Sequence, residues 1–225
     1  MGQIGTLVTG AGVVTTIAGQ SQCEQFILVG TVATANPLQG LVIEIDGVTY
    51  INIVNQPTLL SAYAKWLNGF VSTLRGVLFP IATGNIPSKN TTYRFTNNGA
   101  TTPAIFAYSD NDAGIPFIAS TVQINASSYM DFEKFSALFI GTPANISNAE
   151  IVFASGRKST LTQVEFDSYF AYKTPTTEAN GQLLGASVID NTDQSITSVR
   201  LYASAAVTIL IAKIPDAAFK VLRGK

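Results

Sequence analysis

Histidine is absent from this 225-residue sequence, and cysteine occurs once, at Cys23. Histidine is the side chain most often used for acid–base catalysis near neutral pH and for metal ligation. Its absence excludes Ser-His-Asp and Cys-His catalytic groups and histidine-ligated metals. A single cysteine can form neither an intrachain disulfide nor a cysteine-ligated zinc site, so the disulfide-stapled and zinc-bound classes of protein are excluded as well.

Charge is also scarce. The sequence has 13 Lys and Arg against 14 Asp and Glu, a formal net charge of -1, and charged residues make up 12% of the chain. That fraction is about half the ~25% of an average soluble protein. A chain without a net positive charge has no overall field to attract nucleic acid or anionic lipid. Its polar surface is therefore expected to consist mainly of Thr, Ser, Asn and Gln.

Long hydrophobic runs are missing too, although the mean hydropathy is +0.29. Gly, Pro, Asn, Asp or Gln interrupts every apolar stretch before the ~20 residues that a membrane-spanning helix needs. Residues 1–23 carry no charged side chain, whereas a secretory signal begins with Lys or Arg and continues into an unbroken apolar segment. We expect neither a transmembrane helix nor a signal peptide.

The sequence is rich in short β-branched and aromatic segments bounded by Gly, Pro, Asn or Asp. Such segments are typical of the strands of an all-β protein. Two longer segments, Pro57–Phe70 and Leu161–Tyr172, have helical spacing instead, and each is expected to form one helix. The expected strands are Thr6–Thr16, Glu24–Thr34, Leu41–Asp46, Val48–Val54, Val77–Ala82, Thr92–Thr96, Ala104–Tyr108, Phe117–Ile124, Phe132–Ile140, Glu150–Ala154, Leu183–Asp190, Thr197–Ala203 and Val207–Ile214.

An internal repeat organises these segments into two halves. Glu24-Gln25-Phe26 recurs 109 residues later as Glu133-Lys134-Phe135, and Leu41–Gly47 corresponds to Glu150–Gly156 at the same offset. Chance similarity between turn residues is the alternative explanation. We favour a tandem duplication, because the order of the strands, helix and turns agrees as well as the residues.

The two halves are matched again after their helices, where Phe95–Gly99 is aligned with Val188–Thr192, and each half ends on a β-rich run, Phe117–Ile124 or Val207–Ile214. A half of roughly 100 residues has the length of one antiparallel sandwich with Greek-key connections. We therefore predict an all-β fold of two tandem eight-stranded jelly-roll sandwiches (a double jelly roll), each with one short helix. The predicted domains are an N-terminal jelly roll, residues 1–128, and a C-terminal jelly roll with a basic tail, residues 129–225.

Two patterns in the chain are similar to enzyme motifs. Val8–Gly12 resembles the opening of a dinucleotide-binding turn, but the third glycine and the later acidic residue are missing. Tyr169 and Lys173 have the Tyr-x-x-x-Lys spacing of short-chain dehydrogenases, a fold that needs strands alternating with helices. Because only two helices are expected, we interpret these segments as a glycine-rich first strand and an amphipathic helix. No catalytic residue, no cofactor and no enzymatic activity is predicted.

Acidic pairs occur in turns rich in Asn, Gly and Ser, at Asp110 and Asp112 and at Asp190 and Asp193. Carboxylates in such turns usually accept hydrogen bonds from backbone amides and stay solvated. Asp110 and Asp112 have the alternation of a calcium-binding loop but lack its bidentate glutamate. A loop tip is the simpler interpretation, and no metal site is predicted.

Basic side chains gather at the C-terminus, after the last expected strand. Lys220, Arg223 and Lys225 alternate there with apolar residues. This pattern suits contact with anionic lipid headgroups or with a nucleic-acid backbone. A solvated terminus is the alternative interpretation of the same residues.

The two-copy pattern resembles the double jelly-roll major capsid proteins of tailless icosahedral viruses, especially small bacteriophages with an internal membrane. The resemblance covers about residues 20–214 and implies a structural protein without catalytic residues. It implies homotrimers that form pseudo-hexagonal capsomers in an icosahedral shell around a membrane and genome. The segments that carry it are Phe26–Gly30, Leu38–Gly47, Ile81–Gly84, Thr92–Asn98, Ile105–Ser109, Phe135–Ile140, Glu150–Gly156 and Val188–Asn191.

The same resemblance implies a virion protein made in the host cytoplasm. Its partners would be further copies of itself, minor capsid or penton proteins, and membrane lipid or genome through Lys220, Arg223 and Lys225 on the inner face. A weakly charged surface suits this role, because many copies can then pack without self-repulsion. The alternatives are a virion spike or penton subunit and a carbohydrate-binding β-sandwich. The only tryptophan, Trp66, lies in a helical pattern, where packing explains it better than sugar binding.

Overall fold

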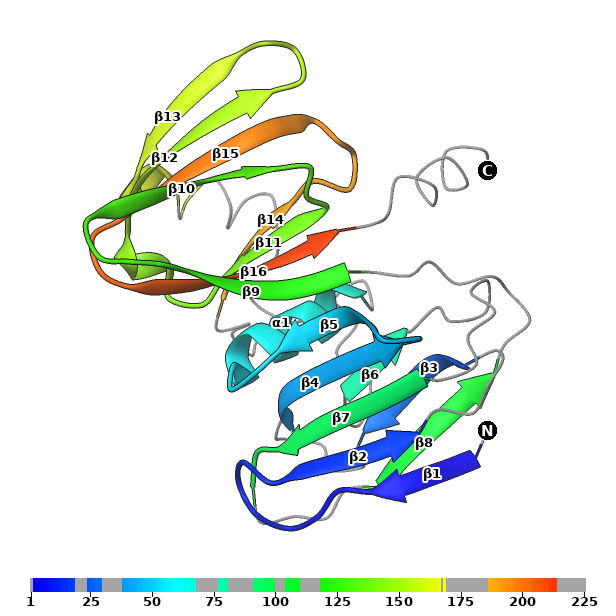
Figure 1. Cartoon of the computed structure of the whole chain (residues 1–225). Helices are drawn as coiled ribbons and strands as arrows, with labels where there is room; N and C mark the ends of the chain where they lie inside the picture. Colours follow the sequence, from blue (N-terminus) through cyan, green and yellow to red (C-terminus); the bar gives the residue numbers. More distant parts are fainter. Residues whose placement is uncertain are drawn as a thin grey trace. The chain divides into compact units, whose positions relative to one another are not determined.

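The computed structural model describes residues 2–18, 24–29, 38–67, 77–80, 91–99, 104–109, 118–166, 168 and 186–213. These residues form sixteen strands. They divide into two compact units, the first extending to Ser120 and the second from Thr121 to Lys213. The division lies earlier in the chain than the boundary expected between residues 128 and 129. The predicted all-β class is confirmed (Figure 1).

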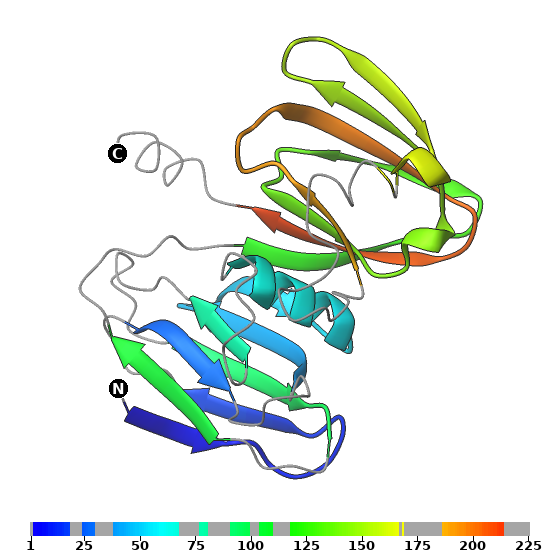
Figure 2. The same cartoon turned by 180° about the vertical axis from the view of Figure 1, so that it is seen from behind.

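The first unit holds eight strands and one helix. In its two layers, neighbouring strands follow the orders β1-β8-β3-β6 and β5-β4-β7-β2, and every pair in these orders is antiparallel. Figure 2 shows α1, in cyan, lying along the strands of this unit. The bounds are β1 Gly2–Thr6, β2 Val14–Ala18, β3 Glu24–Val29, β4 Leu38–Ile45, β5 Val48–Ile53, α1 Pro57–Leu67, β6 Val77–Pro80, β7 Thr91–Asn97 and β8 Ala104–Ser109.

The second unit, taken together with the first three residues of β9, which precede Thr121, repeats this arrangement with each strand number raised by eight. Its layers have the orders β9-β16-β11-β14 and β10-β15-β12-β13. A helical turn, residues 163–166, lies between β13 and β14, as α1 lies between β5 and β6. The bounds are β9 Ile118–Ile124, β10 Ser128–Glu133, β11 Ala137–Ile140, η1 Pro143–Asn145, β12 Ile146–Phe153, β13 Lys158–Thr162, β14 Ser187–Asp190, β15 Ile196–Ala203 and β16 Val207–Lys213. Each unit is thus one eight-stranded jelly roll, and the predicted double jelly roll is confirmed.

Equivalent hairpins in the two units turn at equivalent glycines. Gly47 lies between β4 and β5 with φ of 81°, and Gly156 lies between β12 and β13 with φ of 82°. Glycine adopts this left-handed conformation without the clash that a Cβ atom causes. The 109-residue offset in the sequence therefore records a structural equivalence between these two hairpins.

The predicted alignment of Phe95–Gly99 with Val188–Thr192 is wrong. Phe95 lies in β7, whose equivalent is β15, whereas Val188 lies in β14. Both segments end a strand at a turn with a buried asparagine, Asn97 or Asn191, and this shared turn chemistry produced the similarity. The strand expected at the end of the first half is β9, which pairs with β16 and begins the second set of eight strands.

Two of the expected strands are divided in the structure. Thr6–Thr16 includes the end of β1, a loop and the start of β2, and Phe132–Ile140 includes the end of β10 and all of β11. The loop before β2 carries Val8 and Val13, whose exposed apolar side chains made the run look continuous. β13 was not predicted, because its side chains alternate only between exposed and half-buried positions.

The predicted first helix is confirmed as α1, and the second begins later than expected. Pro57 occupies the first position of α1, where its missing N–H group has no cost. Trp66 is buried and stacks on Tyr63, with ring centroids 6.3 Å apart, as the packing interpretation requires. The segment expected to be helical from Leu161 starts its helical turn at residue 163, because Leu161 pairs with Ala149 in the β12–β13 ladder.

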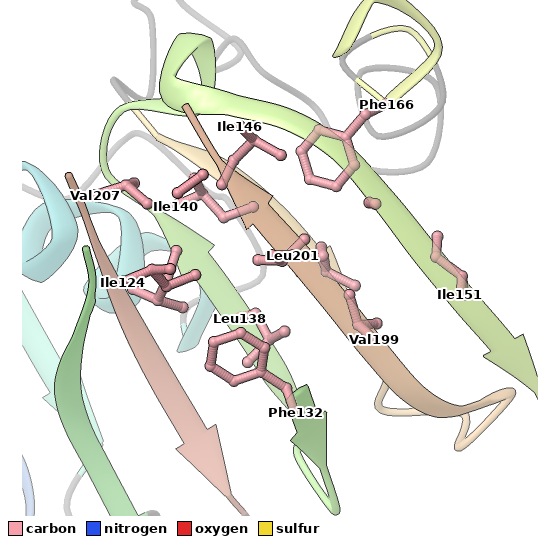
Figure 3. Packing of buried hydrophobic residues seen from close by; sticks show 14 of the residues in the cluster. Ile124, Phe132, Leu138, Ile140, Ile146, Ile151, Phe166, Val199, Leu201 and Val207 are labelled. Carbon is pink, nitrogen blue, oxygen red and sulfur yellow. The ribbon is translucent and has the colours of Figure 1, made fainter. Parts of the chain in front are cut away.

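Buried side chains alternate with more exposed ones along the strands, and the buried ones form the core of each unit. In β15, the side chains of Val199, Leu201 and Ala203 are buried while the residues between them are half-buried. Figure 3 shows the inward side chains of the second unit meeting between its layers, with Phe166 of the helical turn among them. Their removal from water is the main favourable term in folding. The buried cluster consists of Ile124, Phe132, Phe135, Leu138, Ile140, Ile146, Ala149, Ile151, Phe166, Ile189, Ile196, Val199, Leu201, Ala203, Val207 and Ile209.

Candidate interaction surfaces

A row of charged side chains crosses the outer face of the β10-β15-β12-β13 layer. Asp131 of β10 and Glu150 of β12 both lie opposite Arg200 of β15 in the strand register. Arg200 donates from Nε to Asp131 Oδ1 at 2.7 Å and from Nη2 to Asp131 Oδ2 at 3.0 Å. Its Nη1 lies 4.0 Å from Glu150 Oε2. One guanidinium therefore joins carboxylates from two neighbouring strands.

Two tyrosines flank this charged row. The hydroxyl of Tyr202 donates a hydrogen bond of 2.7 Å to Glu150 Oε1. The guanidinium of Arg200 lies over the ring of Tyr129, 4.7 Å from its centroid, and the Tyr129 and Tyr202 centroids are 5.5 Å apart. The cation–π contact with Tyr129 adds to the two hydrogen bonds with Asp131 that orient the guanidinium of Arg200. The charged row therefore includes an arginine, two carboxylates and two aromatic rings in mutual contact.

The Asp131–Arg200 contact shifts the pKa values of both groups so that each stays charged over a wider pH range. The hydrogen bonds from Arg200 lower the pKa of Asp131, and the hydrogen bond to Asp131 is the largest cause that raises the pKa of Arg200. Both side chains remain more than a third exposed, at 48% and 37%. Water and salt screen such pairs, so they contribute little to folding.

The first unit has an ion pair on the equivalent strands. Arg94 of β7 donates to both carboxylate oxygens of Glu44 in β4, from Nη1 to Oε2 at 3.0 Å and from Nη2 to Oε1 at 2.9 Å. The hydrogen bonds from Arg94 are the largest cause of a lowered pKa at Glu44. In each unit an arginine of the seventh strand thus binds a glutamate of the fourth.

Around these ion pairs the two equivalent faces differ in chemistry. In the first unit the positions facing outward on β2 and β7 hold Val, Thr and Ala beside Arg94. In the second unit the corresponding positions of β10 hold Tyr129, Asp131 and Glu133. The face of the first unit is therefore nearly neutral, and that of the second carries several charges.

Comparison with known proteins identifies similar folds but no similar sequences. No family model matches the chain, and no curated protein matches it. The major capsid protein P2 of bacteriophage PM2 is 14% identical, and the alignment covers 92% of this chain and 93% of that one with a TM-score of 0.58. The major capsid protein of STIV is 12% identical, with 95% of each chain covered and a TM-score of 0.54. A chain from the atomic structure of Sulfolobus Turreted Icosahedral Virus is also 12% identical, with 93% of this chain and 89% of that chain covered and a TM-score of 0.54.

The fold is that of the viral double jelly-roll capsid proteins. The alignments run through nearly all of this chain and nearly all of each capsid chain, so the likeness includes both jelly rolls.

The residues predicted to contact lipid or genome in this double jelly-roll chain lie outside the part that the structure describes. Lys220, Arg223 and Lys225 lie outside the described residues, as do Asp110 and Asp112. Within the described ranges, no group of three or more Cys, Asp or Glu could hold a metal ion. In the same ranges, no helix has the length and apolar character needed to cross a membrane.

The second acidic pair, Asp190 and Asp193, was predicted to accept hydrogen bonds from backbone amides in a turn. The backbone N–H of Thr192 donates to Asp190 Oδ1 at 2.9 Å, and that of Ser195 donates to Asp193 Oδ1 at 3.0 Å. Both carboxylates accept backbone hydrogen bonds within the β14–β15 turn. That prediction is confirmed.

The glycine-rich segment Val8–Gly12 is a loop between β1 and β2, not a phosphate-binding turn or a strand. The N–H of Gly10 donates to the carbonyl of Gly99 at 3.1 Å, and the N–H of Gly12 donates to that of Asn97 at 2.8 Å. These amides are already used inside the protein, and a strand follows where a dinucleotide-binding turn has a helix. Tyr169 and Lys173, the other enzyme-like pattern, lie outside the described residues.

The ion pairs that Arg94 and Arg200 form on the two sheet faces were not predicted from the sequence. Each arginine stands between two apolar residues, as Tyr93-Arg94-Phe95 and as Val199-Arg200-Leu201, and all four flanking side chains are fully buried. A single charge between buried neighbours marks the outward position of a strand. This pattern in the seventh strand of each unit was the available signal.

Proposed function

We propose that this protein is a structural subunit of a viral capsid that assembles with copies of itself and has no enzymatic role. The observation that carries the proposal is the presence of two jelly rolls of identical strand order in one chain, aligned over nearly full length with major capsid proteins of two viruses. A capsid role requires no catalytic group, which agrees with a chain that has no histidine.

The finer proposal is a homotrimer. Three copies of a two-roll chain place six jelly rolls around one axis, which gives a pseudo-hexagonal capsomer suited to an icosahedral shell. The near-neutral sheet face of the first unit and the low charged fraction of 12% support such packing, since many copies meet without strong repulsion. Localisation in the virion, as a major coat protein of a bacteriophage with an internal membrane, belongs to the same proposal.

The test is the mass of the purified protein and of the particle. Sedimentation velocity and native mass spectrometry are expected to give a trimer, and a stable monomer throughout the micromolar range would contradict the capsomer. Hundreds of copies in each purified virion are expected for a major coat protein. A few copies in each virion would instead identify a spike or penton subunit.

The basic tail is proposed to contact lipid or genome on the inner face of the shell through Lys220, Arg223 and Lys225. Deletion of residues 219–225 is expected to leave the trimer intact and to reduce the yield of particles. Assembly of this deletion variant around anionic vesicles and around nucleic acid, compared separately with wild type, distinguishes the two partners. Normal particles from the shortened chain would refute the contact.

A further inference from the structure

The edge strand β2 of the first unit is incompletely covered. It is the outermost strand of its layer in the described part of the chain and pairs with β7 on its other side (Figure 1). None of its residues is buried, since exposed and half-buried positions alternate from Val14 to Ala18. An open strand edge presents backbone N–H and C=O groups that can pair with another chain.

Exposed valines extend this edge into the preceding loop. Val8 is 54% exposed, Val13 36% and Val14 51%. The N–H of Val8 donates to Thr15 Oγ1 at 3.0 Å, which holds the loop against the strand. We define the β2-edge surface by its outward residues, which carry no charge: Val8, Val13, Val14, Thr16 and Ala18.

The equivalent strand of the second unit is protected by charge. β10 is likewise the outermost strand of its layer, but Asp131 and Glu133 are exposed along it. Charged side chains on an edge strand are a common way to prevent pairing with other chains. The edge of β10 therefore opposes strand pairing, whereas the structurally equivalent edge of β2 lacks that protection.

We infer that the β2-edge surface is a contact between neighbouring copies of this chain in the shell. Two neutral edges can approach each other without electrostatic cost, whereas two copies of β10 would bring their exposed Glu133 carboxylates, beside the Asp131–Arg200 ion pairs, toward each other. The five residues of β2 span about 16 Å. Pairing along that length buries only a few hundred Å² on each partner, below the ~800 Å² of a stable two-protein complex. Such a contact suits a shell, where several weak contacts hold each copy.

This inference rests on the proposed self-assembly, and its test separates the two. Val14→Lys places a charge at the centre of the β2-edge surface. The matched control is Val48→Lys, because Val48 is a valine of similar exposure, 58%, on β5 of the same unit. Thr16→Glu is a second variant, and it introduces a carboxylate opposite Arg94 in the strand register. Thermal melting followed by circular dichroism first establishes that each variant is folded.

Two measurements decide the result. The first is the protein concentration at which half the chains are assembled. It is expected to rise about tenfold for Val14→Lys, which corresponds to about 1.4 kcal/mol, because a charged group then replaces an apolar side chain in the contact. It should rise for Thr16→Glu and stay within about twofold for Val48→Lys. The second is hydrogen exchange, in which the amides of β2 should slow on assembly while those of β10 stay unchanged.

The outcomes are distinct. Assembly of Val14→Lys and Thr16→Glu at the wild-type concentration overturns the inference and leaves the capsid proposal standing. Unchanged exchange in β2 on assembly does the same. An equal loss of assembly in Val48→Lys shows that any added charge opposes packing, and it also overturns the inference. A wild-type chain that never self-associates refutes the capsid proposal, and this contact with it.

Discussion

Replacement of Asn191 by alanine is expected to lower the free energy of unfolding of the second jelly roll by more than the loss of one polar side chain usually does. Asn191 is buried at the start of the β14–β15 turn. Its Oδ1 accepts the N–H of Ile196 at 2.8 Å, and its Nδ2 donates to the carbonyls of Ile196 at 2.9 Å and Phe135 at 3.2 Å. The side chain thus bridges the two ends of this turn and connects the turn to the segment between β10 and β11.

The magnitude follows from the groups that lose their partners. Alanine removes three hydrogen bonds, each worth about 1 kcal/mol net, and leaves the Ile196 N–H buried without that acceptor, a loss of about 1–3 kcal/mol. Because these terms overlap, we expect a loss of ~2–4 kcal/mol in the free energy of unfolding. This is a large part of the ~5–15 kcal/mol that stabilises a typical domain.

Urea unfolding followed by circular dichroism measures this loss, and hydrogen exchange of the Ile196 amide locates it. The matched control is Asn148→Ala, because Asn148 is half-buried on β12 and its Oδ1 accepts no hydrogen bond. Trp66 lies in the first unit, so its fluorescence reports that unit in the same samples. A loss below ~1 kcal/mol, or one equal to that of the control, would refute the reasoning.

Two further predictions concern the core and the ion pairs. Leu201→Ala empties a fully buried position in the core of the second unit and should cost ~3–5 kcal/mol, measured as a fall in the urea midpoint; a cost under ~1 kcal/mol would mean that the site collapses around the smaller side chain. Arg94 and Arg200 lower the pKa values of Glu44 and Asp131, so the folded state binds their protons more weakly than the unfolded state does. The stability from these pairs is complete above the ordinary carboxyl pKa of about 4 and is lost as the pH falls below it. Because both pairs are exposed, the effect is small: melting temperatures between pH 2 and pH 6 should fall slightly less steeply in a Glu44→Gln, Asp131→Asn double variant, and a steeper fall in that variant would contradict this assignment.

The parts of the fold that were predictable are those with strong local signals. The β4–β5 hairpin was readable because Asp46-Gly47 interrupts two apolar runs, and Gly47 has the positive φ that such a turn needs. Its counterpart at Gly156 followed from the repeat. α1 was readable from apolar residues at helical spacing that are buried in the structure.

The parts that were missed depend on tertiary context. β13, Lys158–Thr162, buries no side chain, so its sequence lacks the apolar alternation by which a strand is recognised. Asn97 and Asn191 occupy turns between different pairs of strands, and local chemistry alone cannot tell those turns apart. The partners of Arg94 and Arg200 are fixed by register between strands distant in sequence, which no local pattern reveals.

The helical segments enter both jelly rolls at the same place, after the fifth strand and before the sixth. A segment inserted between two strands changes neither the register of the ladders nor the buried faces that those ladders present. Extra length at this connection would therefore leave the pairing of the sixteen strands unchanged. Any length added at this connection of the first unit has to leave α1 intact, because its Leu59, Leu60 and Tyr63 side chains are fully buried.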